Sequence, residues 1–187
     1  MTEQHRETYS IEIEGLHRDL PLFEVAPGVT IAIVNILGDT ELIEVSANAL
    51  AERLADLDAD VLVTAEAKSI PLLYALAVRM KLPWVVLRKT HKPYMGEALS
   101  ADTESITTGS LQTLFLDEKD RQHIMNKRVV LVDDVVSTGS TLQGMERVVS
   151  EADGNIVARA AMFTEGDQGK WSEIIALGHL PVFLSDT

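Results

Sequence analysis

The chain has 187 residues, no cysteine and a formal net charge of −13 at pH 7. This length fits one domain with a sizeable core, and the lack of cysteine excludes disulfides and thiolate chemistry. The acidic excess argues against DNA or RNA as the main partner, because binding a phosphate backbone requires a basic surface. No apolar run is long enough to span a membrane and the first ten residues contain no apolar signal segment. We therefore expect a cytoplasmic protein without a membrane partner.

Hydrophobic periodicity predicts strands and helices that alternate along the chain. Strands are expected at residues 11–14, 29–36, 61–65, 84–87, 110–116, 129–132, 156–163 and 181–183. Helices are expected after Asp39 or Thr40, near Pro71, over residues 117–125, after Thr141 and, as a short amphipathic piece, over residues 171–177. This order is typical of an α/β fold with an open, mostly parallel twisted sheet flanked by helices.

Residues 94–109 show no strong period and many small polar side chains. A long loop is expected here, and loops of this length in compact domains often close over a binding site.

The most informative stretch is residues 128–141, RVVLVDDVVSTGST. Its apolar run predicts a strand buried on both faces, directly followed by Asp133 and Asp134. Gly139 lets the next turn approach a ligand closely, and the first N–H groups of the following helix favour an anion such as phosphate. Carboxylates accept hydrogen bonds from sugar hydroxyls or hold hydrated Mg²⁺. A phosphate site beside a diol site indicates a phosphorylated ribose.

This stretch resembles the 5-phosphoribosyl-1-diphosphate (PRPP) motif of the type I phosphoribosyltransferases. In that motif four apolar residues, two acids, two apolar residues and a small residue precede a Thr-Gly turn, and every position is filled here. The resemblance implies that the acids hold the ribose hydroxyls, directly or through Mg²⁺ and water, and that the turn holds the 5′-phosphate. The implied PRPP-binding residues are Asp133, Asp134, Val135, Ser137, Thr138, Gly139, Ser140 and Thr141. The plainer alternative is a buried strand with a solvated acidic end.

Two other strand ends carry cations. Residues 66–70, EAKSI, resemble the Glu-Ala-Arg-Gly-Phe stretch of adenine phosphoribosyltransferases, and residues 88–92, RKTHK, resemble the family's Arg-Lys-x-x-Lys stretch. The resemblance implies that pyrophosphate is bound by Lys68, Ser69, Arg88 and Lys92. Lys68 would also act in catalysis together with Asp133 and Asp134. Residues 88–92 form a basic island in an acidic chain, although a charge run is usually a solvated surface.

The resemblance implies a single domain over residues 1–187, with a core at about residues 38–165 and a small hood from residues 1–37 and 166–187. It implies a glycosyltransferase that moves ribose 5-phosphate from PRPP to a purine base and releases pyrophosphate, with Mg²⁺ as cofactor and a homodimer as its assembly. His17 and Arg18 lie in a shortened match to a hood segment of the adenine enzymes. They would contact the base, with a structural Arg–Asp pair as the alternative.

The expected closing loop departs from the adenine enzymes, which carry Glu-Tyr-Gly where this chain has Ile106-Thr107-Thr108-Gly109. Glu97 or Glu104 would have to supply the missing acid. Adenine is favoured as the acceptor, and xanthine or hypoxanthine stay open because their enzymes share the PRPP half. The other alternative is a PRPP- or nucleotide-binding sensor with little turnover. No fused DNA-binding segment is visible, which weighs against a transcriptional regulator unless a partner supplies that segment.

Overall fold

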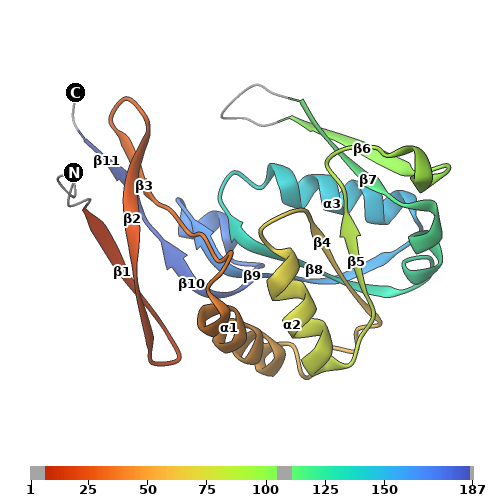
Figure 1. Ribbon diagram of the computed structural model, residues 1–187, viewed down its shortest axis with the longest axis horizontal. Coiled ribbons are helices and arrows are strands. Elements are labelled where there is room, and N and C mark those ends of the chain that lie inside the picture. Colours follow the sequence, from red (N-terminus) through yellow and green to blue (C-terminus); the bar gives the residue numbers. More distant parts are fainter. Residues whose placement is uncertain (1–6, 105–110, 186–187) are drawn as a thin grey trace.

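The computed structural model describes residues 7–104 and 111–185, and its centre is a parallel β-sheet (Figure 1). Its five strands lie in the order β10–β9–β8–β4–β5, and every neighbouring pair is parallel. The strands are β4 (Val61–Ala65), β5 (Trp84–Leu87), β8 (Arg128–Val136), β9 (Asn155–Glu165) and β10 (Ile175–Leu180). The predicted α/β fold is confirmed. All five carboxyl ends point to one edge, where such sheets bind ligands.

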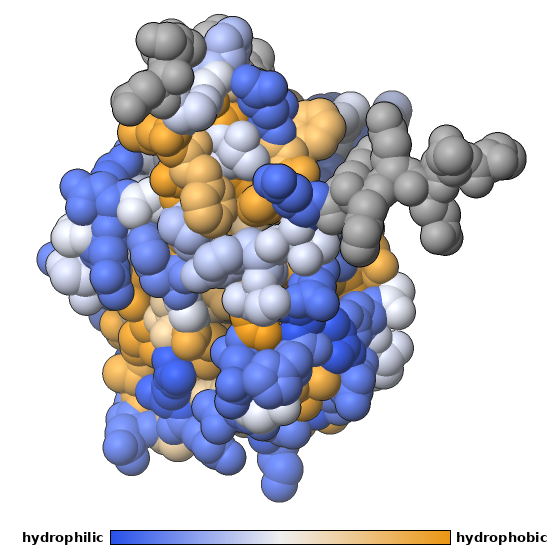
Figure 2. Space-filling model, turned by 90° about the vertical axis from the view of Figure 1, so that its left-hand side faces the viewer, coloured by the Kyte–Doolittle hydropathy of each residue, from blue (hydrophilic) through white to orange (hydrophobic). Residues whose placement is uncertain are grey.

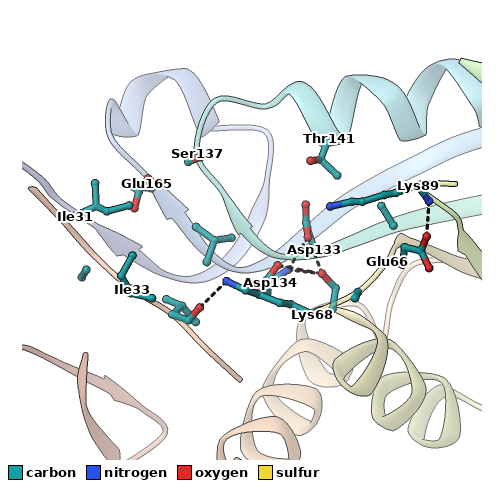
Figure 3. Close-up of a pocket in the computed structure, with 16 residues that line it drawn as sticks. Ile31, Ile33, Glu66, Lys68, Lys89, Asp133, Asp134, Ser137, Thr141 and Glu165 are labelled. Atoms are coloured by element: carbon teal, nitrogen blue, oxygen red, sulfur yellow. Dashed lines mark hydrogen bonds between the residues drawn. The ribbon is translucent and has the colours of Figure 1, made fainter. Parts of the chain in front are cut away.

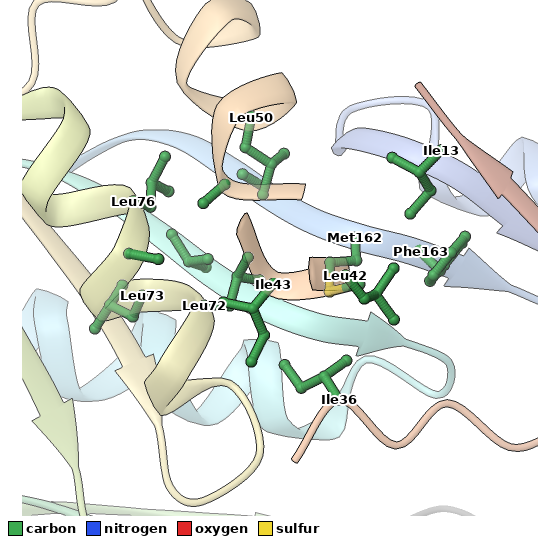
Figure 4. Close-up of a cluster of buried hydrophobic side chains, with 14 of the residues drawn as sticks. Ile13, Ile36, Leu42, Ile43, Leu50, Leu72, Leu73, Leu76, Met162 and Phe163 are labelled. Carbon is green, nitrogen blue, oxygen red and sulfur yellow. The ribbon is translucent and has the colours of Figure 1, made fainter. Parts of the chain in front are cut away.

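Helices cover both faces of this sheet. Helices α1 (Thr40–Arg53) and α2 (Ile70–Met80) lie on one face, and α3 (Ser140–Glu151) lies on the other. Because both faces are covered, residues 61–65 and 129–132 are fully buried, as predicted, and all of them except Thr64 are apolar. Figure 4 shows Leu50 from α1 and Leu76 from α2 in the core on their side of the sheet.

The start of α1 agrees with the sequence prediction. Asp39 is the N-cap, and its side chain accepts a hydrogen bond from the Leu42 N–H at 3.0 Å. The predicted stripe of Ile43, Ala47 and Leu50 is buried against the sheet. None of the described helices is long and apolar enough to cross a membrane.

A small antiparallel sheet, the hood, stands beside the parallel sheet. Its strands β1 (Thr8–Ile13), β2 (Leu16–Ala26), β3 (Val29–Ala32) and β11 (Val182–Leu184) pair in the order β1–β2–β3–β11. The two ends of the described chain thus meet in one sheet, where the rings of Tyr9 and Phe183 pack edge to face with centroids 5.7 Å apart. Figure 2 views this side and shows apolar patches among hydrophilic side chains.

The prediction of a long loop over residues 94–109 is wrong for the part that the structure describes. A 3₁₀ turn, η1 (Pro93–Met95), leads into β6 (Leu99–Glu104), which pairs with β7 (Leu111–Leu116) as an antiparallel hairpin over α3. The close contact depends on Gly144, because a Cβ there would lie 2.7 Å from Thr103 Cγ2 and 2.9 Å from Leu114 Cδ1. Residues 105–110 lie outside the described residues, and with them most of the segment compared with Glu-Tyr-Gly.

Several smaller boundaries also differ from the prediction. Strand β3 ends at Ala32 rather than residue 36, and the helix expected at residues 117–125 is a 3₁₀ helix, η2 (Glu118–His123). The amphipathic piece expected at residues 171–177 is split between the 3₁₀ turn η3 (Gln168–Trp171) and β10. So short an apolar run fits the period of a helix and the period of a strand equally well. Strand β8 continues past the acids to Val136, paired with β9. This last difference changes the environment of Asp133.

Candidate functional site

A cavity of about 340 Å³ lies between hood strand β3 and the carboxyl ends of β4, β8 and β9. Residues 31–34 and Glu165 form its hood end, while Glu66 and Lys89 lie at the opposite end (Figure 3). The acids Asp133 and Asp134 lie between these two ends. The cavity therefore joins a hood end lined by apolar residues and Glu165, a carboxylate centre, and an end that carries Lys89.

The two acids are held in place by Ser69, the residue before α2. The Ser69 hydroxyl lies 2.7 Å from Asp133 Oδ1 and 3.1 Å from Asp134 Oδ1, and the Asp134 N–H donates to Asp133 Oδ1 at 2.9 Å. Asp133 is only 8% exposed. Its burial and the neighbouring charge of Asp134 raise the pKa of Asp133 to about 7. The solvated acidic end of the plainer alternative is thus wrong for Asp133, because β8 and its pairing with β9 extend beyond it.

The turn at residues 137–141 forms a smaller pocket of about 40 Å³ beside the acids. Gly139 precedes α3 with φ at +84°, in the left-handed region that favours glycine. Ser140 and Thr141 are the first residues of α3, so their N–H groups have no partner within the helix. Backbone N–H groups and hydroxyls converging at a helix start suit a phosphate group.

The η3 segment packs against the same turn. A Cβ on Gly139 would lie 2.6 Å from Trp171 Cη2. The Trp171 Nε1–H donates to the Glu165 carbonyl at 3.0 Å, and Lys170 Nζ donates to the Thr138 carbonyl at 3.2 Å. These contacts hold the turn at residues 137–141 against η3, and hold η3 against the end of β9.

Cations at two strand ends reach the cavity. Lys68 follows β4, and its Nζ donates to the Val34 carbonyl at 3.3 Å; the Glu66–Ala67 peptide bond before it is cis. Glu66 accepts hydrogen bonds from Arg88 Nε at 2.6 Å and from the Lys89 N–H at 2.5 Å. Glu66 thereby neutralises Arg88, while the side chains of Lys68 and Lys89 line the cavity.

Residues 34–176 match the family model of the phosphoribosyl transferase domain. The chain belongs to the phosphoribosyltransferase family. The matched region contains the acids, the turn and both cationic strand ends.

Relatives of this phosphoribosyltransferase chain include enzymes and a regulator. The adenine phosphoribosyltransferase of Solidesulfovibrio magneticus is 33% identical over 148 residues, which cover 79% of this chain and 83% of that protein. The purine biosynthesis transcriptional repressor of Bacillus subtilis is 29% identical over 132 residues, 71% of this chain but 46% of the repressor, so the chain spans about half the length of some curated relatives. The crystal structure of adenine phosphoribosyltransferase from Thermoanaerobacter pseudethanolicus shares the fold with a TM-score of 0.67 at 22% identity, covering 92% of this chain and 95% of that chain.

The structure brings together most of the residues predicted from the phosphoribosyltransferase motif. The two pockets share lining residues, and the predicted residues that line one or both are Lys68, Ser69, Asp133, Asp134, Val135, Ser137, Thr138, Gly139, Ser140 and Thr141. Arg88 and Lys92 do not line these pockets. Their part in pyrophosphate binding stays a prediction.

The structure places His17 and Arg18 away from the cavity. Arg18 donates to Asp39 at 2.8 Å and to Glu41 at 2.7 Å, which ties hood strand β2 to the start of α1 and holds the pKa of Asp39 below its usual value. This is the structural Arg–Asp pair that was the alternative to base binding. The His17 ring lies 3.6 Å from Glu12 on β1. Base contact by either residue stays a prediction that this geometry does not favour.

Sequence reasoning missed Lys89, Glu66, Glu165 and the hood residues 31–34 as cavity residues. Lys89 and Glu66 lie within the stretches that resemble the family, so their neighbourhood was identified but their roles were not. Glu165 has a weaker signal, since it ends the strand after the motif strand, at the ligand-binding edge of the sheet. The apolar residues 31–34 carry no signal that separates them from core.

The acid pair is also the place where a metal ion would bind. No group of three or more metal-ligating side chains occurs within residues 7–104 and 111–185. Mg²⁺ often takes only one or two carboxylates and completes its shell with water and substrate phosphates. Asp133 and Asp134 fit this type of site.

Proposed function

We propose that this chain transfers ribose 5-phosphate from PRPP to a purine base, with adenine favoured, and releases pyrophosphate. The observation that carries the proposal is the order of groups along the cavity. The acid pair, with the phosphate turn (residues 137–141) beside it, lies between Lys89 at one end and the hood end, where Lys68 Nζ contacts the Val34 carbonyl. The 5′-phosphate, the diol and the pyrophosphate of PRPP match the phosphate turn, the acid pair and the two lysines, respectively. The hood end is then left for the acceptor base.

The residues of the cavity would act by positioning and by charge. The turn would bind the 5′-phosphate through backbone N–H groups, and Asp133 and Asp134 would accept hydrogen bonds from the ribose hydroxyls. By analogy with glycoside chemistry, the bond from C1 to pyrophosphate breaks through an oxocarbenium-like transition state, and negative charge grows on the leaving group. Lys68 and Lys89 would stabilise that charge. Mg²⁺ held by the two acids and by PRPP oxygens would add further positive charge.

Calorimetric titration with PRPP, with and without Mg²⁺, tests the binding half of this proposal. Adding adenine, hypoxanthine, guanine and xanthine in turn, while pyrophosphate release is monitored, tests transfer. We expect tighter PRPP binding with Mg²⁺, and release with adenine in preference to the other bases. A protein that binds no PRPP would refute the proposal.

A second candidate is a module that binds PRPP as a signal with little turnover. The similarity to a purine biosynthesis repressor favours it, as does the segment at residues 106–109 that lacks the Glu-Tyr pair of adenine enzymes. This candidate shares the polar part of the cavity with the transferase. PRPP binding without pyrophosphate release for any of the four bases would select it.

We also propose that the chain forms a homodimer through α2 and the edge strand β5. Tyr74, Val78 and Trp84 are 57%, 58% and 41% exposed there, and the rings of Tyr74 and Trp84 lie 5.9 Å apart. Exposed apolar groups that gather in one place are typical of interaction surfaces. Sedimentation velocity should show a dimer for the wild type and a monomer for Val78→Glu. A wild-type monomer at micromolar concentration would contradict the assembly.

A further inference from the structure

Glu165 closes the hood end of the cavity. It is the last residue of β9, is 8% exposed, and lines the cavity together with residues 31–34. Its backbone is fixed by Trp171, whose Nε1–H donates to the Glu165 carbonyl at 3.0 Å. Figure 3 shows Glu165 beside Ile31, at the opposite end from Lys89.

The Glu165 carboxyl differs from the other acids of the cavity because it has no protein partner among the described residues. Asp133 and Asp134 share the Ser69 hydroxyl, and Glu66 binds Arg88. Burial raises the pKa of the Glu165 carboxyl above its usual value. A carboxyl that lines a cleft without a protein partner commonly faces a ligand.

We propose that Glu165 selects the acceptor base, by accepting a hydrogen bond from the amino group of adenine and by disfavouring purines with an oxygen at C6. This inference rests on the proposed function to the extent that the hood end holds the base. Ile31 and Ile33 offer apolar contacts for a flat ring, and Glu165 supplies a polar group beside them. An ionised carboxylate can only accept hydrogen bonds, so an amino group satisfies it whereas a 6-oxo group repels it.

Binding of AMP and IMP, which differ at C6, tests this inference without requiring turnover. Calorimetry at pH 8 should show tighter binding of AMP than of IMP to the wild type. In Glu165→Gln the amide can donate to the 6-oxo group, so the ratio of the two affinities should fall by about tenfold, the order expected for one hydrogen bond. Glu165→Asp keeps an acceptor-only group and should keep the preference for AMP. Glu151→Gln, an exposed residue at the end of α3, serves as the surface control and should bind as the wild type does.

Ribose 5-phosphate separates a role in base selection from a structural role. It carries no base, so its affinity should be the same in the wild type, Glu165→Gln and Glu165→Asp. An unchanged AMP-to-IMP ratio in Glu165→Gln, loss of ribose 5-phosphate binding in both variants, or a wild type that binds neither nucleotide would each overturn the inference. Pyrophosphate release tests the transferase separately. A wild type that prefers AMP but releases no pyrophosphate would refute transfer and support base selection.

Discussion

Replacing Gly139 with alanine tests whether the phosphate turn needs this glycine for two separate reasons. Its φ is +84°, and an added Cβ would lie 2.6 Å from Cη2 and 3.2 Å from Cζ3 of Trp171. The left-handed backbone costs about 1–2 kcal/mol for a residue with a Cβ, and overlap with a packed ring adds about 1–3 kcal/mol. Gly139→Ala should therefore lower the free energy of unfolding by about 2–5 kcal/mol, and each kcal/mol should lower Tm by about 2–4 °C for a chain of this length.

Gly38 provides the matched control for the backbone cost. Its φ is +89°, yet nothing lies within 4 Å of a Cβ built there. Gly38→Ala should thus lose only about 1–2 kcal/mol. Thermal and urea unfolding followed by circular dichroism measure both variants, and ribose 5-phosphate titration should show weaker binding for Gly139→Ala alone.

The contact with the indole ring can be isolated by a double-mutant cycle. Trp171→Leu removes the ring that an alanine at position 139 would overlap, so the double variant should be more stable than the two single losses predict. Equal losses for Gly139→Ala and Gly38→Ala, together with additive effects in the cycle, would refute the close contact between η3 and the phosphate turn.

Three further predictions concern the charged groups of the cavity. Asp133→Asn combined with Asp134→Asn should weaken PRPP binding by about tenfold or more while thermal unfolding stays cooperative, because each hydrogen bond to a charged group contributes about 1.5–3 kcal/mol; unchanged affinity would contradict the ribose assignment. Lys89→Ala should weaken pyrophosphate binding more than Lys92→Ala in calorimetry, because Lys89 lines the cavity and Lys92 does not; equal losses would favour the original assignment of Lys92. Burial raises the folded-state pKa of Glu165, so its contribution to stability is fully present below its unfolded pKa and is lost as the pH rises through the folded pKa. The Tm of Glu165→Gln minus that of the wild type should accordingly increase between about pH 4 and pH 8. A Tm difference that does not change with pH would contradict the raised pKa of Glu165.

The sequence predicted the parts of the site that depend on local pattern. Residues 128–141 specify a buried strand, an acid pair, a turn and a helix within one short segment, and the structure places all of them in that order. The parallel sheet then brings the ends of β4 and β8 together by its topology alone. Ser69 and Lys68 could therefore be placed near the acids before the structure was known.

Contacts between distant segments explain what the sequence did not predict. Arg88 and Lys89 are neighbours in the chain, but Glu66 from another strand end binds the Arg88 side chain and the Lys89 backbone, which leaves the Lys89 side chain in the cavity. The hairpin at β6 was missed because its inward residues, such as Ala101 and Thr103, are small or polar and weaken the alternating pattern. Arg18 of β2 pairs with Asp39 at the start of α1, far from it in the sequence, rather than with a residue of its own strand.

The hood end of the cavity is where binding of PRPP and transfer to a base make different demands. A PRPP sensor needs only the phosphate turn, the acids and the cations, whereas a transferase also needs a place for the acceptor. In a sensor that never binds a base, the Glu165 carboxyl at the hood end would have no ligand group to contact. Lys68 connects the two halves, because it lines the PRPP half and donates to the Val34 carbonyl in the hood segment. Tighter binding of AMP than of ribose 5-phosphate would show that the hood end contributes affinity for a base. Equal binding would show that it does not, and would favour the PRPP sensor over the transferase.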